Sequence, residues 1–109
     1  MMKSRAEVLR VVREFRDQLR GIYGERLKGV YLYGSYARGD ARDDSDIDVA
    51  VVLEGPVNRA QERWRASELV SETALRTRYL VMPLFLSVEE YQRGSFAVHR
   101  SIARAGIPV

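Results

Sequence analysis

The chain of 109 residues contains no cysteine, only one histidine and no long apolar run. Without cysteine it can form neither a disulfide nor a thiolate metal site, which is consistent with a reducing compartment. No apolar run approaches the roughly 20 residues that a membrane span requires. The amino terminus also lacks the charged and then apolar layout of a signal peptide. We therefore expect a cytoplasmic protein that does not enter a membrane.

The composition is that of one small folded domain. Hydrophobic residues make up 46% of the chain and charged residues 30%, a balance that argues against disorder. This length allows one core but no separate substrate domain, so we expect a single domain over residues 1–109 that a small substrate or a partner completes. The net charge of +3 comes from arginines dispersed among acidic residues. This favours a mixed-charge surface, and nucleic-acid binding is kept as a weaker hypothesis.

Hydrophobic periodicity and turn signals predict a small α/β (α+β) fold. The expected order is helix, strand, strand, helix, strand, helix, helix, which gives a mixed sheet of three or more strands flanked by helices. Capping signals at Ser4, Asn58 and Ser87 mark the starts of three helices. The predicted strands cover 27–33, 47–53 and 78–86, and the predicted helices cover 4–23, 58–76, 88–93 and 96–105.

The sequence also predicts the role or burial of several individual side chains. Pro83 cannot donate to a sheet ladder, so the third strand should be an edge or carry a bulge. Ser95 should cap the last helix, and His99 should be a surface or partly packed residue of that helix. The positions expected to face the core are Val8, Val12, Phe15, Leu19 and Ile22 of the first helix, and Ala60, Trp64, Val70 and Ala74 of the second.

The most informative stretch runs from Gly34 to Asp48, between two predicted strands. Asp46 and Asp48 start the second strand, where residues two apart point to the same face, so their carboxylates can share cations. Such a pair suits Mg²⁺, with up to two ions, in phosphoryl or nucleotidyl transfer. Gly34 lets a phosphate approach the backbone, and Ser35 adds a hydroxyl donor. Together these features predict a site for metal-bound phosphate.

Arginines complete the predicted phosphate site. Arg38 and Arg42 lie between the glycine turn and the carboxylates, where they can offset the charge of a triphosphate. Either half of the motif alone is more often a simple turn or strand entry. The two halves in this order, at adjoining strand ends, favour a functional site.

Three common motifs do not fit these residues. A Walker P-loop requires lysine and then serine or threonine where Asp40 and Ala41 stand. A calcium EF-hand loop requires glycine at Val49 and glutamate at Gly55. The dinucleotide fingerprint requires glycine at Tyr36.

With Gly34-Ser35, ten intervening residues and then Asp46-Ile47-Asp48, the chain resembles the polymerase-beta-like nucleotidyltransferase superfamily. Residues 34–39 and 45–48 are similar to the signature of the small prokaryotic minimal nucleotidyltransferases. The resemblance covers most of the chain. It implies magnesium and a nucleoside triphosphate, usually ATP. It also implies that Gly34, Ser35 and the neighbouring Ser45 belong to the nucleotide site and that Asp46 and Asp48 bind the metals.

The same resemblance implies a partner. Proteins of this group are often encoded beside a HEPN-domain protein, and the pair resembles a toxin–antitoxin system in which the nucleotidyltransferase is the antitoxin and transfers AMP onto the toxin. We therefore expect a HEPN-like partner or a second copy of the chain.

One departure from that family concerns a third carboxylate. The family commonly carries it on the strand after the long helix, where it completes the metal site or helps to deprotonate the attacking hydroxyl. Residues 79–86 contain no acidic residue; Glu72 precedes this segment, and Glu89 and Glu90 follow it. Three explanations stay open: two carboxylates suffice at a reduced rate, a partner completes the site, or the protein binds nucleotide without efficient transfer.

Two functional hypotheses follow. The leading one is a magnesium-dependent nucleotidyltransferase that transfers a nucleoside monophosphate, AMP from ATP, to an acceptor hydroxyl, for example on a HEPN-type toxin. The alternative is a catalytically weak or inactive protein of the same fold that neutralises its partner by contact.

Overall fold

The computed structural model describes residues 4–109. Residues 1–3, on which the signal-peptide prediction partly rests, lie outside the described residues. The helices are α1 (Arg5–Tyr23), α2 (Ser35–Arg38), α3 (Arg59–Arg65), α4 (Ser67–Thr77), α5 (Val88–Arg93) and α6 (Ala97–Ala105), with a 3-10 turn at Gly24–Arg26. The strands are β1 (Leu27–Tyr33), β2 (Ile47–Leu53), β3 (Val81–Ser87) and β4 (Ile107–Pro108). No helix among residues 4–109 is long and apolar enough to cross a membrane.

The four strands form one mixed sheet in the order β3-β2-β1-β4. β1 pairs antiparallel with β2 and with β4, whereas β2 pairs parallel with β3. The predicted α/β class and mixed sheet are confirmed. β3 lies at an edge, as the proline at position 83 indicated. The short strand β4 was not predicted, because two residues that include a proline form no pattern of their own.

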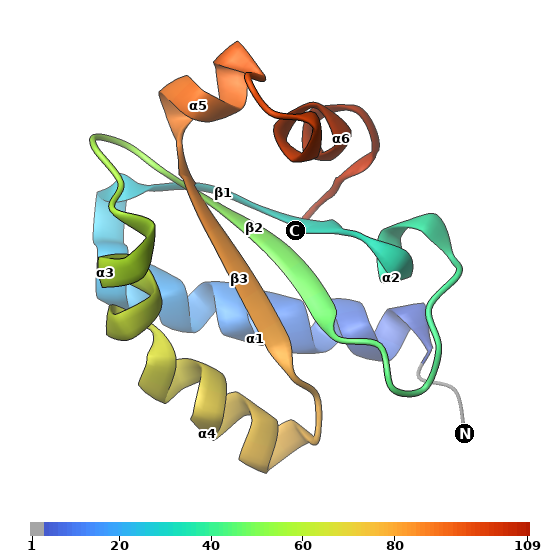
Figure 1. The fold of residues 1–109 in the computed structure, drawn as a ribbon. Coiled ribbons are helices and arrows are strands. Elements are labelled where there is room, and N and C mark those ends of the chain that lie inside the picture. Colours follow the sequence, from blue (N-terminus) through green and yellow to red (C-terminus); the bar gives the residue numbers. More distant parts are fainter. Residues whose placement is uncertain (1–3) are drawn as a thin grey trace.

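Helices cover both faces of the sheet (Figure 1). On one face, α1 and α4 pack on the larger apolar cluster, in which Phe15 and Phe85 are at most 1% exposed. On the other face, α5 and α6 cover a smaller cluster that contains Ala50 and Ile102. Alternate residues of β2 therefore serve different layers. Asp48 and Ala50 share the α6 face, which places the carboxylate of Asp48 away from the main core.

The apolar stripe of α1 was predicted correctly except at its end. Val8, Val12, Phe15 and Leu19 are buried, but Ile22 is 40% exposed and Tyr23 is buried in its place. The Tyr23 hydroxyl donates to Glu62 Oε1 at 2.9 Å. The inward position after Leu19 is therefore four residues on, not three.

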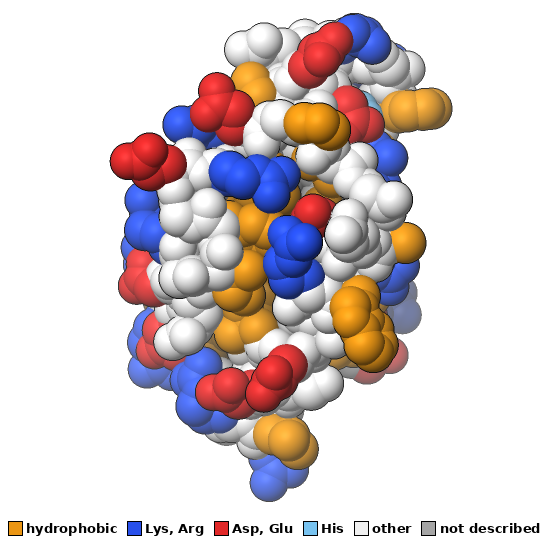
Figure 2. Space-filling view, turned by 90° about the vertical axis from the view of Figure 1, so that its left-hand side faces the viewer, with side chains coloured by type: hydrophobic (Ala, Val, Ile, Leu, Met, Phe, Trp, Pro, Cys, Tyr) orange, Lys and Arg blue, Asp and Glu red, His pale blue; other side chains and the backbone are white. Residues whose placement is uncertain are grey.

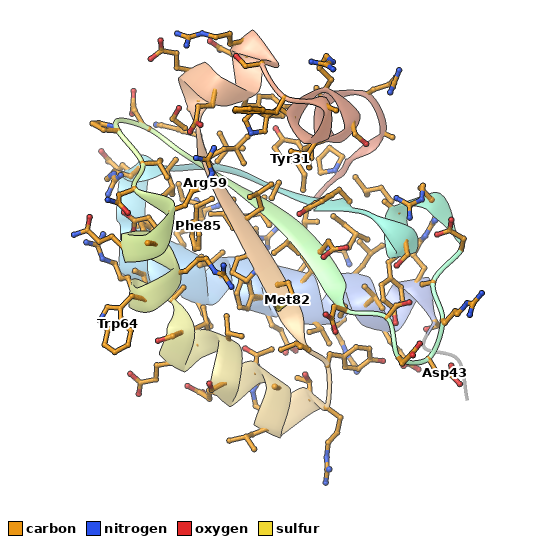
Figure 3. The ribbon with its side chains drawn as sticks, viewed as in Figure 1. Tyr31, Asp43, Arg59, Trp64, Met82 and Phe85 are labelled. Atoms are coloured by element: carbon orange, nitrogen blue, oxygen red, sulfur yellow. The ribbon has the colours of Figure 1, made fainter. Side chains whose placement is uncertain are left out.

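The predicted helix over 58–76 is two helices, α3 and α4, that meet at the fully buried Ala66. The inward prediction for Trp64 was wrong: its side chain is 80% exposed and points away from the molecule (Figure 3). Ala60 is exposed as well, whereas Val70 and Ala74 are half-buried. The reason is Glu62, which turns inward to Tyr23, so Trp64, about 200° further round the helix, faces solvent.

Helix starts were predicted better than burial near the end of the chain. Ser4, Asn58 and Ser87 each accept from the backbone N–H three residues on. Ser95 does not cap α6: the N-cap residue is Phe96, with no side-chain cap. His99 is not at the surface either, because its side chain is only 2% exposed. Its ring lies edge-on to the Phe96 ring, with 5.3 Å between the two ring centroids.

Candidate functional site

Gly34 joins β1 to α2 in a conformation that essentially only glycine adopts. Its φ is 74° and its ψ is −151°. A Cβ placed on Gly34 would lie 2.4 Å from Asp48 Oδ2 and 3.2 Å from Asp48 Cγ. This closeness follows from the register, in which Tyr33, the residue before Gly34, is the pairing partner of Asp48. The turn and the carboxylate are thus close together, and any other residue at position 34 would force the Asp48 side chain to shift.

The short helix α2 is fixed at both ends. The carbonyl of Gly34 accepts from the N–H groups of Ala37 and Arg38 at 3.1 and 3.0 Å. Gly39, with a φ of 88°, ends the helix in the left-handed region. From α1, the Arg5 guanidinium donates to the carbonyls of Tyr36 and Ala37. These bonds hold the segment that follows the glycine turn.

A cavity of about 540 Å³ lies at this end of the sheet. One wall consists of Tyr33, Gly34, Ser35, Arg38 and Asp48. The structure therefore brings four of the seven predicted site residues together in one pocket. The opposite wall is the start of α6, with Ala97, Val98 and Ser101. The sequence analysis missed this wall, because its three residues form no motif and reach the site only through the tertiary fold.

The two predicted metal-binding carboxylates differ in exposure. Asp46 is exposed directly before β2, whereas Asp48 is half-buried. Burial raises the pKa of Asp48, the charge of Asp46 raises it further, and Arg38 opposes the change. Burial, together with the charge of Asp48, also raises the pKa of Tyr33 to about 12. Repulsion between two neighbouring carboxylates is relieved by a cation, so this donor pair fits a divalent metal ion.

Three of the predicted site residues, Arg42, Ser45 and Asp46, precede β2 and do not line the cavity. Arg38, which does line it, has its Nε 3.3 Å from Asp40 Oδ2. Ser45 Oγ accepts from the Arg42 N–H at 2.8 Å, and the Ser45 N–H donates to the Arg42 carbonyl at 3.0 Å. Ser45 therefore shapes the turn that delivers Asp46. Nucleotide or metal binding by each of the seven predicted site residues stays a prediction.

Met82 is the residue of β3 that pairs with Asp48. The parallel register of β2 and β3 pairs Asp48 with Met82, and paired residues share a face of the sheet. Among the described residues, no group of three or more His, Cys, Asp and Glu side chains is placed to hold a metal ion. A smaller cavity of about 200 Å³ opens at Met82 and Pro83 against Val70 of α4. Figure 2 shows the side of the molecule on which this smaller cavity opens, where hydrophobic side chains lie between arginine or lysine side chains.

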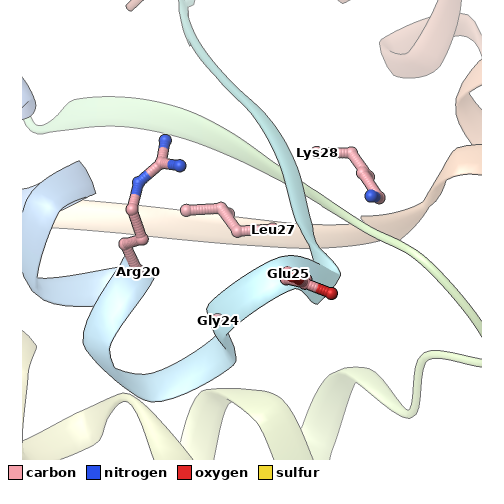
Figure 4. Close-up of a pocket in the computed structure, with 5 residues that line it drawn as sticks. All are labelled: Arg20, Gly24, Glu25, Leu27 and Lys28. Atoms are coloured by element: carbon pink, nitrogen blue, oxygen red, sulfur yellow. The ribbon is translucent and has the colours of Figure 1, made fainter.

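A further cavity, of about 570 Å³, lies at the opposite end of β1. It is lined by Arg20, Gly24, Glu25, Leu27 and Lys28, and Figure 4 shows the Arg20 and Lys28 side chains on either side of Leu27. This cavity is lined by a single carboxylate, that of Glu25, and so lacks a carboxylate pair. It is therefore a poorer site for metal-bound phosphate than the pocket at Asp48.

A mixed sheet that carries a glycine-serine turn beside a carboxylate pair is the arrangement of a nucleotidyltransferase. The chain matches the family described as "Nucleotidyltransferase domain" over residues 12–101 and belongs to that family of enzymes. A Methanocaldococcus jannaschii protein named "Putative protein adenylyltransferase MJ0141" is 30% identical over 78 residues, which are 72% of this chain and 78% of that protein. A second protein from the same organism, "Putative protein adenylyltransferase MJ0604", is 44% identical over 43 residues, 39% of this chain and 43% of that protein.

Solved structures share the fold. A protein titled "putative nucleotidyltransferase from Sulfolobus solfataricus" superposes with a TM-score of 0.68 at 24% identity, over 99% of this chain and 87% of that one. A structure titled "toxin-antitoxin with AMP-PNP" superposes with a TM-score of 0.61 at 23% identity, over 87% of this chain and 69% of that one. At these identities the likeness concerns the fold alone.

Proposed function

We propose that this domain, residues 1–109, transfers a nucleoside monophosphate from a nucleoside triphosphate, ATP in the first instance, to a hydroxyl group of a partner protein. The observation that carries the proposal is the contact between the Gly34 turn and the Asp48 carboxylate, within 2.4 Å of where a Cβ would stand. The closeness of the Gly34 turn to the Asp48 carboxylate supports a single site for phosphate and metal.

Each group in the pocket has a role in that reaction. Gly34, Ser35 and Arg38 would hold the triphosphate through backbone, hydroxyl and guanidinium donors. Asp46 and Asp48 would hold one or two Mg²⁺ ions. An Mg²⁺ ion held by these two carboxylates would supply charge neutralisation on the α-phosphate and on the leaving pyrophosphate. The acceptor hydroxyl oxygen attacks the α-phosphorus and loses its proton to solvent, while the bond to the bridging oxygen breaks and pyrophosphate leaves. Positioning and charge neutralisation therefore dominate.

The absence of a carboxylate on β3 bears on the acceptor. A neighbouring carboxylate could remove the proton of an aliphatic hydroxyl, but Met82 offers no base beside Asp48. A phenolic hydroxyl ionises near pH 10 and depends less on such a base. A tyrosine of the partner protein is therefore the acceptor that this site suits best. The names of the Methanocaldococcus relatives, which describe transfer of adenylyl groups to protein, support a protein acceptor.

The proposal is tested by transfer from α-labelled ATP to the protein encoded beside this chain. We expect the label on that protein in the presence of Mg²⁺, and its loss with Asp46→Asn or Asp48→Asn. Transfer at the wild-type rate by either variant would contradict the assignment of these carboxylates. A HEPN-like acceptor with a toxin activity that the label abolishes would establish the antitoxin role.

A second function is favoured by the same lack of a carboxylate on β3. A nucleotidyltransferase fold with a weak site could neutralise its partner by contact alone, as an antitoxin subunit. That function predicts a complex that forms without Mg²⁺ or ATP and leaves the partner unlabelled. Measuring complex formation and labelling in the same samples distinguishes it from transfer.

A further inference from the structure

The two walls of the pocket at Asp48 differ in chemistry. The wall from β1, α2 and β2 is polar, with the Ser35 hydroxyl, the Arg38 guanidinium and the Asp48 carboxylate. The α6 wall consists of two alkyl side chains, Ala97 and Val98, and one hydroxyl, Ser101. The cavity of about 540 Å³ falls within the range of roughly 300–1,000 Å³ for small-molecule sites.

The start of α6 is held in place by the packing of its other side. Ala97 and Ser101 are four residues apart and Val98 and Ser101 three apart, so all three lie on one side of the helix. The residues of α6 that face the sheet, His99 and Ile102, are at most 2% exposed. Beyond the helix, β4 pairs with β1 at Leu32 and Tyr31. The wall is therefore a fixed part of the fold.

We infer that this face of α6 holds the nucleobase and selects it by size, not by its hydrogen-bonding edge. The inference rests on the proposed function, because phosphate and metal at the polar wall leave the α6 wall for the nucleoside. Ser101 is the one hydrogen-bonding side chain of this wall, and its hydroxyl can both donate and accept. It can therefore pair with the amino group of adenine or with the carbonyl group of guanine.

Base selectivity should be correspondingly weak. A site built to hydrogen-bond a substrate group rejects an analogue by about 10⁴-fold or more, whereas a difference in apolar contact gives only about 10–200-fold. We therefore expect ATP and GTP to bind within about 10-fold of each other. CTP and UTP should bind more weakly than either purine nucleotide, because the smaller ring buries less apolar area.

The test measures the dissociation constants of ATP, GTP, CTP and inorganic tripolyphosphate with Mg²⁺ in excess. Val98→Glu puts a carboxylate on the α6 wall, and a nucleobase bound there would have to strip water from it. Val98 is 37% exposed, so this substitution does not insert a charge into the core. Ala103→Glu is the matched control, with the same added charge on an exposed residue of α6 outside the cavity lining. Working at about 0.15 M salt limits repulsion between the new charge and the phosphates. Thermal melts verify that both variants are folded.

We expect Val98→Glu to weaken ATP and GTP by about 10-fold or more while tripolyphosphate changes by less than about 3-fold. Ala103→Glu should change none of them. An unchanged ATP affinity in Val98→Glu, an equal loss for tripolyphosphate, or a wild-type preference for ATP over GTP above about 100-fold would each overturn the inference. None of those three results contradicts the proposed function. The proposed function fails on different results, namely if wild-type protein binds no nucleoside triphosphate or if Asp48→Asn transfers label at the wild-type rate.

Discussion

Replacing Gly34 with alanine tests the contact on which the candidate site depends. With φ at 74° and ψ at −151°, a residue with a Cβ is strained by about 1–3 kcal/mol. The new methyl group would also lie 2.4 Å from Asp48 Oδ2, and relieving such overpacking costs about 1–3 kcal/mol more. We expect Gly34→Ala to lower the free energy of unfolding by about 2–6 kcal/mol. The displaced Asp48 carboxylate should also reduce Mg²⁺-dependent nucleotide binding.

A double-mutant cycle separates the two contributions. In an Asp48→Ala background the oxygen at 2.4 Å is gone, although the Asp48 Cβ position at 3.2 Å remains. Gly34→Ala should then cost only about the 1–3 kcal/mol of backbone strain. Urea denaturation of the four proteins gives the coupling energy. If Gly34→Ala costs the same in both backgrounds, the steric argument is refuted, and if it costs nothing in either, the backbone argument is refuted too.

Three further results are expected. Because the pKa of Asp48 is raised in the folded protein, the protonated carboxyl stabilises the fold at pH values below its pKa in the unfolded chain. This stabilisation is lost as the pH rises through the pKa of Asp48 in the folded protein. In the absence of metal, Asp48→Asn should therefore raise the free energy of unfolding at pH 7. The difference in free energy of unfolding between the variant and wild type should disappear toward pH 4. A difference that stays constant in urea titrations over this pH range would contradict the assigned cause. Met82→Asp places a carboxylate beside Asp48 and should raise the rate of label transfer by about 10-fold or more, unless the partner already supplies the base. Trp64→Gln should change the free energy of unfolding by at most about 0.5 kcal/mol, whereas Phe85→Ala should lower it by about 3–5 kcal/mol; a large loss with Trp64→Gln would contradict its exposure.

The sequence was sufficient where the signal is local. Cap residues, such as Ser87 with Glu90, act within four positions of the chain, and the helix starts predicted from Ser4, Asn58 and Ser87 are confirmed, although Ser95 does not cap α6. The mixed sheet followed from hydrophobic runs of strand length. The Gly34 turn and the Asp48 carboxylate are near each other in the chain, so their meeting could be expected from two adjoining strand ends.

What the sequence could not supply depends on contacts between distant segments. Trp64 was expected inside because it is large and apolar, but the pairing of Glu62 with Tyr23, 39 positions away, sets the orientation of α3. His99 was expected to be a surface or partly packed residue, yet the packing of α6 on the sheet buries it. The α6 wall of the pocket was missed for the same reason. Its three small or apolar residues gain a role only from the pocket that they close.

The short strand β4 has a consequence for the order in which the site is built. The glycine turn and both aspartates lie within residues 34–48, so this part of the site can form once β1 and β2 have paired. The α6 wall comes some 50 residues later in the chain, and β4, which follows it, must return to β1 across the length of the domain. Loop closure of that span comes late in folding and during synthesis. A nascent chain that ends before residue 97 would therefore carry the glycine turn and both aspartates without the α6 wall of the pocket.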